Sequence, residues 1–129
     1  MRKQHPTLTP QELAIMKVVW RLESATVRDV YDALRARRPI AYTTVMTMMR
    51  ILEEKRFLRR TMVERAHVYR PAKPRHQVLG AMVRDFVDRV FDGASDPLLV
   101  HLARDNKLTD KQRDIVKRLI EDGDQNEEE

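Results

Sequence analysis

The sequence predicts a mainly α-helical fold with one small β-hairpin, namely a winged helix-turn-helix followed by a helical dimerisation domain. Two observations carry this prediction. In residues 1–72, three amphipathic helical segments precede one β-rich hairpin, which is the element order of a winged helix. In residues 73–123 the apolar pattern is helical throughout, and residues 124–129 form an acidic segment that we expect to be a flexible tail.

Capping residues mark the starts of the first two helices. Thr9 is followed by proline and, three residues on, by Glu12, which is a capping box with proline at the first helical position. Apolar residues then recur at helical spacing to about residue 23, and Trp20 is expected in the core. Thr26 with Asp29 starts a shorter second helix, and Pro39 stops any helix before it.

A third helix is predicted from about Tyr42 to Lys55, and a hairpin follows it. The apolar positions of this helix form a one-sided stripe of Val45, Met48, Met49 and Leu52. Residues 57–63 and 67–69 are β-rich and are separated by the polar residues 64–66, with a proline closing the hairpin at position 71. Because two strands alone are marginal in water, the hairpin is expected to pack on the helices.

The remaining helices carry apolar stripes that this small segment cannot bury by itself. We predict a long helix over about 75–91, a short helix from residue 95 or 96, and a last helix that starts at a second capping box, Thr109 to Gln112. A unit of this size buries too little surface to be stable alone, so pairing with a second copy is expected. A monomer whose helices fold back on the winged helix is the alternative. The expected dimer residues are Leu79, Met82, Val83, Phe86, Val90, Phe91, Leu98, Leu102, Val116 and Leu119.

The positive charge of the chain is concentrated in its first half. Residues 1–72 hold 15 Lys and Arg against 7 Asp and Glu, whereas residues 73–129 hold 10 against 13. A basic domain joined to an acidic one is typical of a polyanion-binding head on an assembly module. The charge alone is equally compatible with an unevenly charged solvated surface.

The outward face of the third helix is the predicted DNA-reading surface. Short threonine side chains let a helix approach a duplex closely, and an arginine contacts guanine or phosphate. A threonine cluster by itself is also typical of a solvated helix face, and Tyr42 is as suited to packing as to binding a phosphate. The coincidence of topology, helix polarity and charge favours DNA. The predicted DNA-binding residues are Tyr42, Thr43, Thr44, Thr47 and Arg50 on the helix, with Arg59 and Arg65 on the hairpin.

Other classes of function find little support. The four histidines are scattered, the chain has only three glycines and no cysteine, and no nucleophile elbow or metal-binding motif occurs, so we expect neither an enzyme nor a metal or other cofactor. No apolar run is long enough to span a bilayer, and the basic N-terminus lacks the apolar core of a secretory signal, so a cytoplasmic protein is expected. A winged-helix protein–protein adapter that does not bind DNA is the alternative function. RNA binding is disfavoured because no exposed aromatic platform is expected on the strands.

Residues 41–50, Ala-Tyr-Thr-Thr-Val-Met-Thr-Met-Met-Arg, closely resemble the recognition helix of the penicillinase repressor family, BlaI/MecI, which also contains copper-responsive CopY members. Residues 13–20 resemble the first helix of that family, residues 26–30 its second helix, and residues 65–71 its wing and exit. The resemblance covers residues 8–72 and continues beyond them in length and helix order.

The resemblance implies a homodimeric repressor that binds a palindromic double-stranded DNA operator. In the family, a membrane-bound sensor metalloprotease commonly leads to cleavage of the repressor in its C-terminal domain. The matching place here is His101–Leu102, where the best-known members have Asn and Phe. Copper-responsive members need cysteines, which this chain lacks. Ile51 stands where many relatives have a basic residue, and Arg56 replaces a common glycine.

Overall fold

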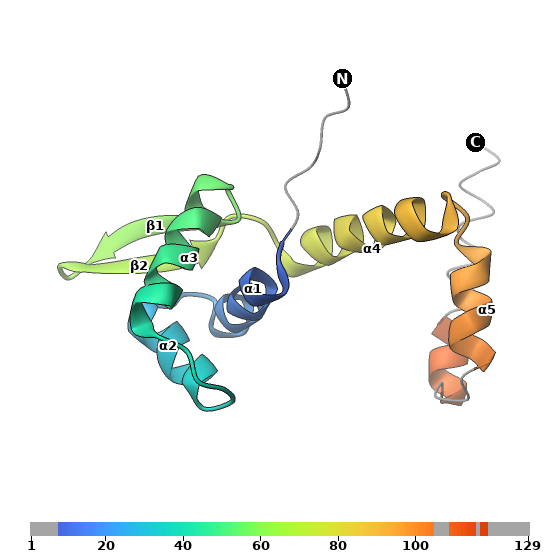
Figure 1. The fold of residues 1–129 in the computed structure, drawn as a ribbon, viewed down its shortest axis with the longest axis horizontal. Coiled ribbons are helices and arrows are strands. Elements are labelled where there is room, and N and C mark those ends of the chain that lie inside the picture. The colour runs from blue at the N-terminus through green and yellow to red at the C-terminus, as the bar shows by residue number, and fades with distance from the viewer. Residues whose placement is uncertain (1–7, 105–108, 116, 119–129) are drawn as a thin grey trace, which may run out of the picture. The chain divides into compact units, whose positions relative to one another are not determined.

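The computed structural model describes residues 8–104, 109–115 and 117–118 and has the predicted mainly helical architecture with one hairpin. The chain divides into two compact units, Met1–Ala81 and Met82–Glu129. The division falls within one helix, later than the domain boundary that we expected between residues 72 and 73. The elements are α1 (Pro10–Leu22), α2 (Val27–Arg35), α3 (Tyr42–Glu54), β1 (Leu58–Val63), β2 (Ala66–Pro71), α4 (Arg75–Phe91) and α5 (Asp96–Arg104) (Figure 1).

The predicted capping box at the start of α1 and the predicted Thr26 cap at the start of α2 are both confirmed, and the cap at α2 is also a full capping box. At α1, the Glu12 backbone N–H donates to Thr9 Oγ1 at 3.2 Å, and the Thr9 N–H donates to Glu12 Oε1 at 2.8 Å. At α2, Asp29 and Thr26 exchange the same two bonds, at 3.1 and 3.0 Å. Each box satisfies two backbone donors that would otherwise lack a partner at the helix end.

The core of the first unit lies among the three helices and the base of the hairpin. Its fully buried side chains come mainly from the predicted stripes of α1, α2 and α3. Two expectations need correction. Trp20 is only half-buried, and its indole N–H donates to the backbone carbonyl of Lys73 at 3.1 Å. Met48 is also half-buried and lies at the edge of the α3 stripe. The fully buried side chains are Ile15, Met16, Val19, Val30, Val45, Met49 and Leu52.

The hairpin is an antiparallel pair joined by a turn of two residues, so the predicted three-residue separation was wrong. Val63 pairs directly with Ala66, which places Ala66 inside β2. Glu64 and Arg65 form the turn with φ values of 49° and 70°, the left-handed conformation that both central residues of a type I′ turn require. The pair Glu-Arg lacks the asparagine and glycine that signal such a turn, which is why the sequence pattern did not reveal it.

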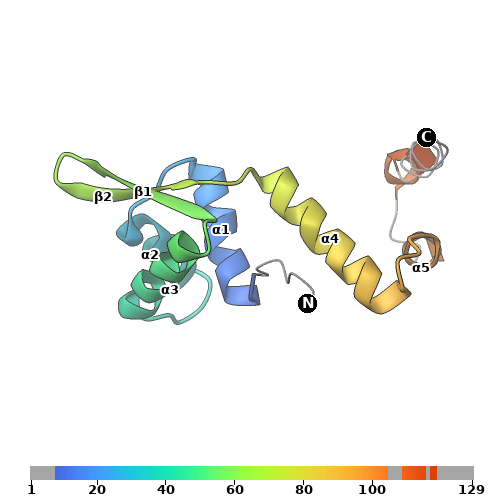
Figure 2. The same ribbon diagram turned by 90° about the horizontal axis from the view of Figure 1, so that it is seen from above.

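A third strand segment supports the hairpin at its base. The backbone groups of Ala25, in the connection between α1 and α2, exchange two hydrogen bonds with Tyr69 of β2, at 2.9 and 2.8 Å. Both residues are buried, at 1% and 2% exposure. The turn end of the hairpin extends beyond the helices in both views (Figures 1 and 2). The base of the hairpin is therefore fixed to the helical core while its tip stands in solvent.

The C-terminal end of α3 is closed by a Schellman motif. The Phe57 N–H donates to the Leu52 carbonyl at 2.9 Å, and the Arg56 N–H donates to the Glu53 carbonyl at 3.0 Å. Arg56 occupies the left-handed position of the motif, with φ of 67°. A glycine would adopt this conformation without the steric cost that the Cβ atom of Arg56 imposes.

Helix α4 ends where predicted, at a turn in which Asp92 and Gly93 both have positive φ. The predicted capping box of the last helix is confirmed, because Thr109 and Gln112 exchange hydrogen bonds of 2.9 and 3.1 Å. Among the expected dimer residues, Val116 and Leu119 lie outside the described residues, as does the expected tail. No helix in the described part of the chain combines the length and hydropathy needed to cross a membrane.

Candidate nucleic-acid interface

Helix α3 separates a buried side from an exposed one. Val45, Met49 and Leu52 have no solvent exposure at all. The predicted contact residues lie on the remaining surface of the helix, and all of them are exposed: Thr43, Thr44, Thr47 and Arg50. The helix is thus held by its apolar side and presents short hydroxyls and one guanidinium to solvent, as a groove-binding helix requires.

The N-terminus of α3 carries no side-chain cap. Ala41 is the N-cap residue, and no side chain hydrogen-bonds to the first turn. The first intrahelical bond runs from the Val45 N–H to the Ala41 carbonyl, at 3.2 Å. The first backbone N–H groups therefore remain available to an anion at the positive end of the helix dipole.

Tyr42 packs against α2 and is still partly exposed. Its ring meets that of Tyr31 edge to face, with centroids 5.4 Å apart, and the residue is 40% exposed. Arg28 and Arg35 lie over the Tyr31 ring at 5.7 and 5.3 Å, and both pair with Asp32 at 3.4 Å. Tyr42 therefore belongs to an aromatic and arginine cluster that fixes the start of α3 against α2.

The basic residues of this region fall into two groups. Arg28 and Arg35 pair with Asp32, and Arg60 pairs with Glu53 of α3 at 3.5 Å. The three predicted contact arginines, Arg50, Arg59 and Arg65, make no salt bridge with any described residue. Their charge is therefore not neutralised by a neighbouring carboxylate in the described part of the chain.

A groove of about 300 Å³ lies between α3, the start of α2 and the hairpin. Met46 and Arg50 line it from α3, and Arg60 and His67 line it from the hairpin. Cross-strand partners share a face, and Arg60 pairs with the buried Tyr69, so this face of the hairpin is the one that meets the helices. The sequence pattern did not assign Met46 to the exposed side of α3, and only the strand register shows that Arg60 and His67 are the hairpin residues that face α3.

Arg59 lies on the other face of the hairpin. It pairs with Arg70 in the register, and the alternation of side chains along β1 separates it from Arg60 and from the groove. Arg65 lies at the turn, so it is placed at the tip as expected. The five predicted helix residues all lie on α3, whereas Arg59 and Arg65 lie on separate parts of the hairpin. The helix residues are Tyr42, Thr43, Thr44, Thr47 and Arg50.

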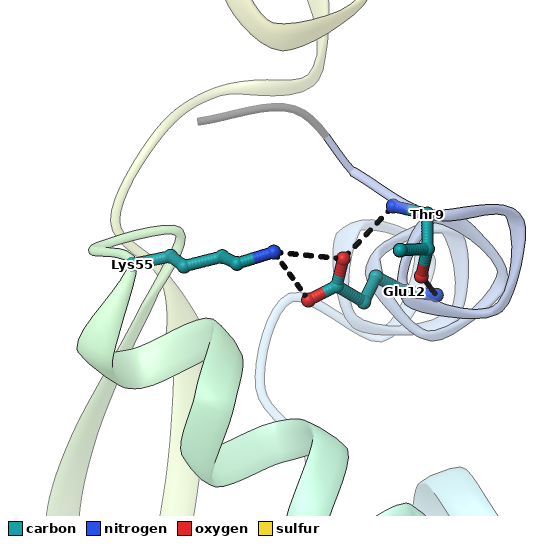
Figure 3. A network of polar contacts seen from close by, with 3 residues as sticks. All are labelled: Thr9, Glu12 and Lys55. Atoms are coloured by element: carbon teal, nitrogen blue, oxygen red, sulfur yellow. Dashed lines mark hydrogen bonds and ion pairs between the residues drawn. The ribbon is translucent and has the colours of Figure 1, made fainter. Parts of the chain in front are cut away.

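A partly buried ion pair holds the C-terminal end of α3 (Figure 3). The Lys55 ammonium lies 3.0 Å from both carboxylate oxygens of Glu12, which is only 3% exposed. Burial by itself raises the pKa of Glu12, but hydrogen bonds from the Thr9 backbone N–H and from Lys55, together with the Lys55 charge, bring this pKa below its ordinary value. The first turn of α1 is thereby joined to the C-cap of α3.

Within the ranges that the structure describes, His, Asp and Glu side chains form no cluster able to hold a metal ion. The chemistry of this surface is that of hydroxyl, guanidinium and backbone N–H donors. Such donors recognise phosphates and base edges.

The penicillinase repressor family profile matches residues 8–122, which is most of the chain. The chain belongs to the penicillinase repressor family. The members it is similar to are transcriptional repressors, so this chain is a DNA-binding transcriptional repressor and not an enzyme.

Two curated relatives and one solved structure illustrate the similarity. The transcriptional regulator BlaI of Mycobacterium tuberculosis is 34% identical over 111 residues, which cover 84% of this chain and 79% of that protein. The penicillinase repressor of Bacillus licheniformis is 22% identical over 120 residues, covering 93% and 94%. The solution structure of monomeric B. licheniformis BlaI in complex with the blaP half-operator has a TM-score of 0.50 and 28% identity, and covers 58% of this repressor and 92% of that chain.

Proposed function

We propose that this repressor acts as a homodimer in the cytoplasm and binds a palindromic operator by inserting α3 of each copy into the major groove. The observation that carries the proposal is the polarity of α3. Thr43, Thr47 and Arg50 are exposed on a helix whose opposite side is fully buried. The half-operator complex of a similar protein supports this choice of ligand.

The threonine hydroxyls and the Arg50 guanidinium have different roles in recognition. Thr43, Thr44 and Thr47 are short enough to let the α3 backbone approach base edges, and Arg50 reaches guanine or a phosphate at the groove wall. The uncapped N-terminus at Tyr42 receives a phosphate of the backbone. Phosphate contacts fix the position of the helix on the duplex, and base contacts supply the sequence preference.

The hairpin supplies a second contact along the duplex. Arg65 occupies a left-handed turn position at which glycine would be less strained. Keeping an unpaired arginine at a strained turn is understandable if its guanidinium has a function, here a contact to the backbone or the minor groove. Arg59, on the outer face of the same hairpin, is assigned to flanking phosphates.

The dimer forms through α4 and the helices that follow it. Leu79, Val83, Phe86 and Val90 recur at the spacing that places them on one face of α4. In the single chain Val83 is 55% exposed and Val90 is 52% exposed. Met82, Phe91 and Leu98, which are half-buried, and Leu102, which is 41% exposed, extend the apolar surface. Burying such residues against a second copy stabilises a dimer by roughly 1.5–3 kcal/mol for each fully buried side chain, before ordering costs.

Two linked heads bind a palindrome far more tightly than one, because the second head binds intramolecularly. A signal that weakens the dimer therefore releases the operator. We place that signal on the C-terminal helices, and His101–Leu102 of α5, both exposed, are the proposed cleavage position for a sensor metalloprotease.

The test is selection of bound genomic DNA by the full-length repressor, followed by titration of the selected duplex at several salt concentrations. We expect a palindromic site and a logarithm of affinity that falls linearly with the logarithm of salt concentration. Thr47→Glu should weaken binding about a hundredfold or more, since it replaces a donor by a carboxylate that phosphates repel.

Gln77→Glu on α4 is the matched control, because Gln77 is exposed, neutral and outside α3. It should leave operator affinity nearly unchanged. Equal affinities of wild type and Thr47→Glu, with both proteins shown to be folded by circular dichroism, would refute the assignment of α3. Binding that does not depend on salt would favour a protein–protein adapter instead.

A further inference from the structure

A second groove, of about 720 Å³, lies between α1 and the C-terminal end of α2. No residue of α3 or of the hairpin lines it. We call it the α1–α2 groove. Its basic lining residues are Lys17 and Arg21 of α1, Arg37 and Arg38 just after α2, and Arg75 at the start of α4.

The charge of the α1–α2 groove is unbalanced. No aspartate or glutamate lines it, and none of its five cationic side chains forms a salt bridge with a described residue. Arginines elsewhere on this unit, such as Arg28 and Arg60, are paired with carboxylates. Like charges that line one groove raise its electrostatic potential, so the groove attracts an anionic partner.

The floor of the α1–α2 groove is apolar. It is formed by Leu13, Val18 and Leu34, of which Val18 and Leu34 are 8% and 6% exposed. A DNA duplex presents a hydrated row of phosphates and has no side chain to place on such a floor. An amphipathic helix has apolar side chains at i, i+3, i+4 and i+7 for the floor and charged side chains on its flanks for the rim.

We propose that the α1–α2 groove docks an acidic amphipathic helix of a partner protein. Apolar side chains of that helix would lie on Leu13, Val18 and Leu34. Its carboxylates would pair with Lys17 and Arg21 on one side and with the arginines after α2 on the other. The long aliphatic stems of these cationic residues add apolar contact below each charged group. None of the groove-lining residues belongs to α3, so we expect the repressor to bind this partner and DNA at the same time.

The probe is a fluorescein-labelled synthetic peptide of about 14 residues, roughly four helical turns, with leucines on one face and glutamates on its flanks. Fluorescence anisotropy with the full-length protein measures its affinity. Lys17→Glu/Arg21→Glu and, separately, Arg37→Glu/Arg38→Glu should each weaken peptide binding about tenfold or more. Circular dichroism melting checks that each variant is folded.

Arg59→Glu/Arg65→Glu is the matched control, since it makes the same change of charge on the hairpin. It should leave peptide affinity within about twofold of wild type, and a peptide with lysines in place of glutamates should not bind. The proposal is overturned by equal losses in the groove and hairpin variants, by the absence of peptide binding to the wild type, or by displacement of the peptide by operator DNA. Continued operator binding by the two groove variants distinguishes this proposal from the DNA-binding function.

Discussion

The ammonium group of Lys55 lies 3.0 Å from each carboxylate oxygen of Glu12, so an ion pair joins the first turn of α1 to the C-cap of α3. The Glu12 side chain is 4% exposed and that of Lys55 is 32% exposed. The pair therefore lies at the edge of the core, where desolvation is costly unless both partners are present.

This pair predicts an acid-dependent stability. The folded-state pKa of Glu12 lies below its ordinary value of 4.5, so Glu12 adds stability that is complete above about pH 4.5 and is lost as the pH falls through the lower, folded-state pKa. Glu12→Gln keeps an acceptor for the Thr9 N–H but removes the charge. It should lower the free energy of unfolding by about 1–2 kcal/mol at pH 7, and the difference from wild type should shrink in acid.

Urea unfolding over about pH 3 to 7 measures both effects. Glu54→Gln, which removes an exposed carboxylate next to Lys55 at the end of α3, is the control and should be nearly neutral. A constant difference between wild type and Glu12→Gln at all pH values would contradict the role given to the ion pair.

Arg56 predicts a stabilising substitution. Its φ of 67° is unfavourable for any residue with a Cβ atom, so Arg56→Gly should raise the free energy of unfolding by about 0.5–1 kcal/mol despite the entropy of glycine in the unfolded chain. Arg56→Ala keeps the strain while removing the charge, and it should bring no gain. Thermal unfolding of the wild type, Arg56→Gly and Arg56→Ala measures these differences. An equal gain in stability for Arg56→Ala would mean that the loss of charge, and not the relief of strain, stabilises the fold.

Arg65 predicts opposite changes in stability and in DNA affinity. Arg65→Gly relieves the turn, whose φ at this residue is 70°, and should stabilise the fold by up to about 1 kcal/mol. The same substitution removes the proposed phosphate contact, so operator affinity should fall about fivefold and the salt slope by about one. Arg65→Lys retains a charge at the turn and should restore most of the affinity. A glycine variant that binds operator as tightly as wild type would remove the hairpin tip from the proposed interface.

Phe86 predicts a link between assembly and operator binding. Phe86 is 40% exposed in the single chain and packs edge to face with Phe91 at 5.8 Å. Phe86→Asp would bury a charge in the proposed dimer, so sedimentation should show dimerisation weakened about a hundredfold, with operator affinity falling in parallel. Gln77→Asp, at an exposed position of α4 away from Phe86, is the control. A wild-type protein that sediments as a monomer at micromolar concentration would disprove the dimer.

Local features of this fold were the ones that could be predicted from the sequence. Capping boxes depend on residues three apart, so those at Thr9, Thr26 and Thr109 could be recognised directly and are confirmed. The helix limits near Tyr42 and Phe91 followed from apolar spacing and from the residues that end a helix. The exposed side of α3 is the complement of a stripe that the sequence shows plainly.

The features that could not be predicted join distant parts of the chain or depend on strand register. Nothing local pairs Lys55 with Glu12 or joins Ala25 to Tyr69, because those contacts exist only after the helices have packed. Arg60, and not Arg59, lines the groove between α3 and the hairpin, because the length of the turn sets the strand register. That length was wrong by one residue because Glu64 and Arg65 adopt left-handed backbone without the usual residues.

The two hydrogen bonds between Ala25 and Tyr69 fix the hairpin at its base only. Beyond this fixed base, the side chains of β1 are all exposed from Arg59 onward. Bending of the hairpin changes the position of its tip without moving its base or the helical core. If Arg65 contacts the duplex as proposed, the hairpin tip would follow differences in duplex width while α3 stays fixed on the core. Operator shape and operator sequence would then be read by mechanically separate parts of the repressor.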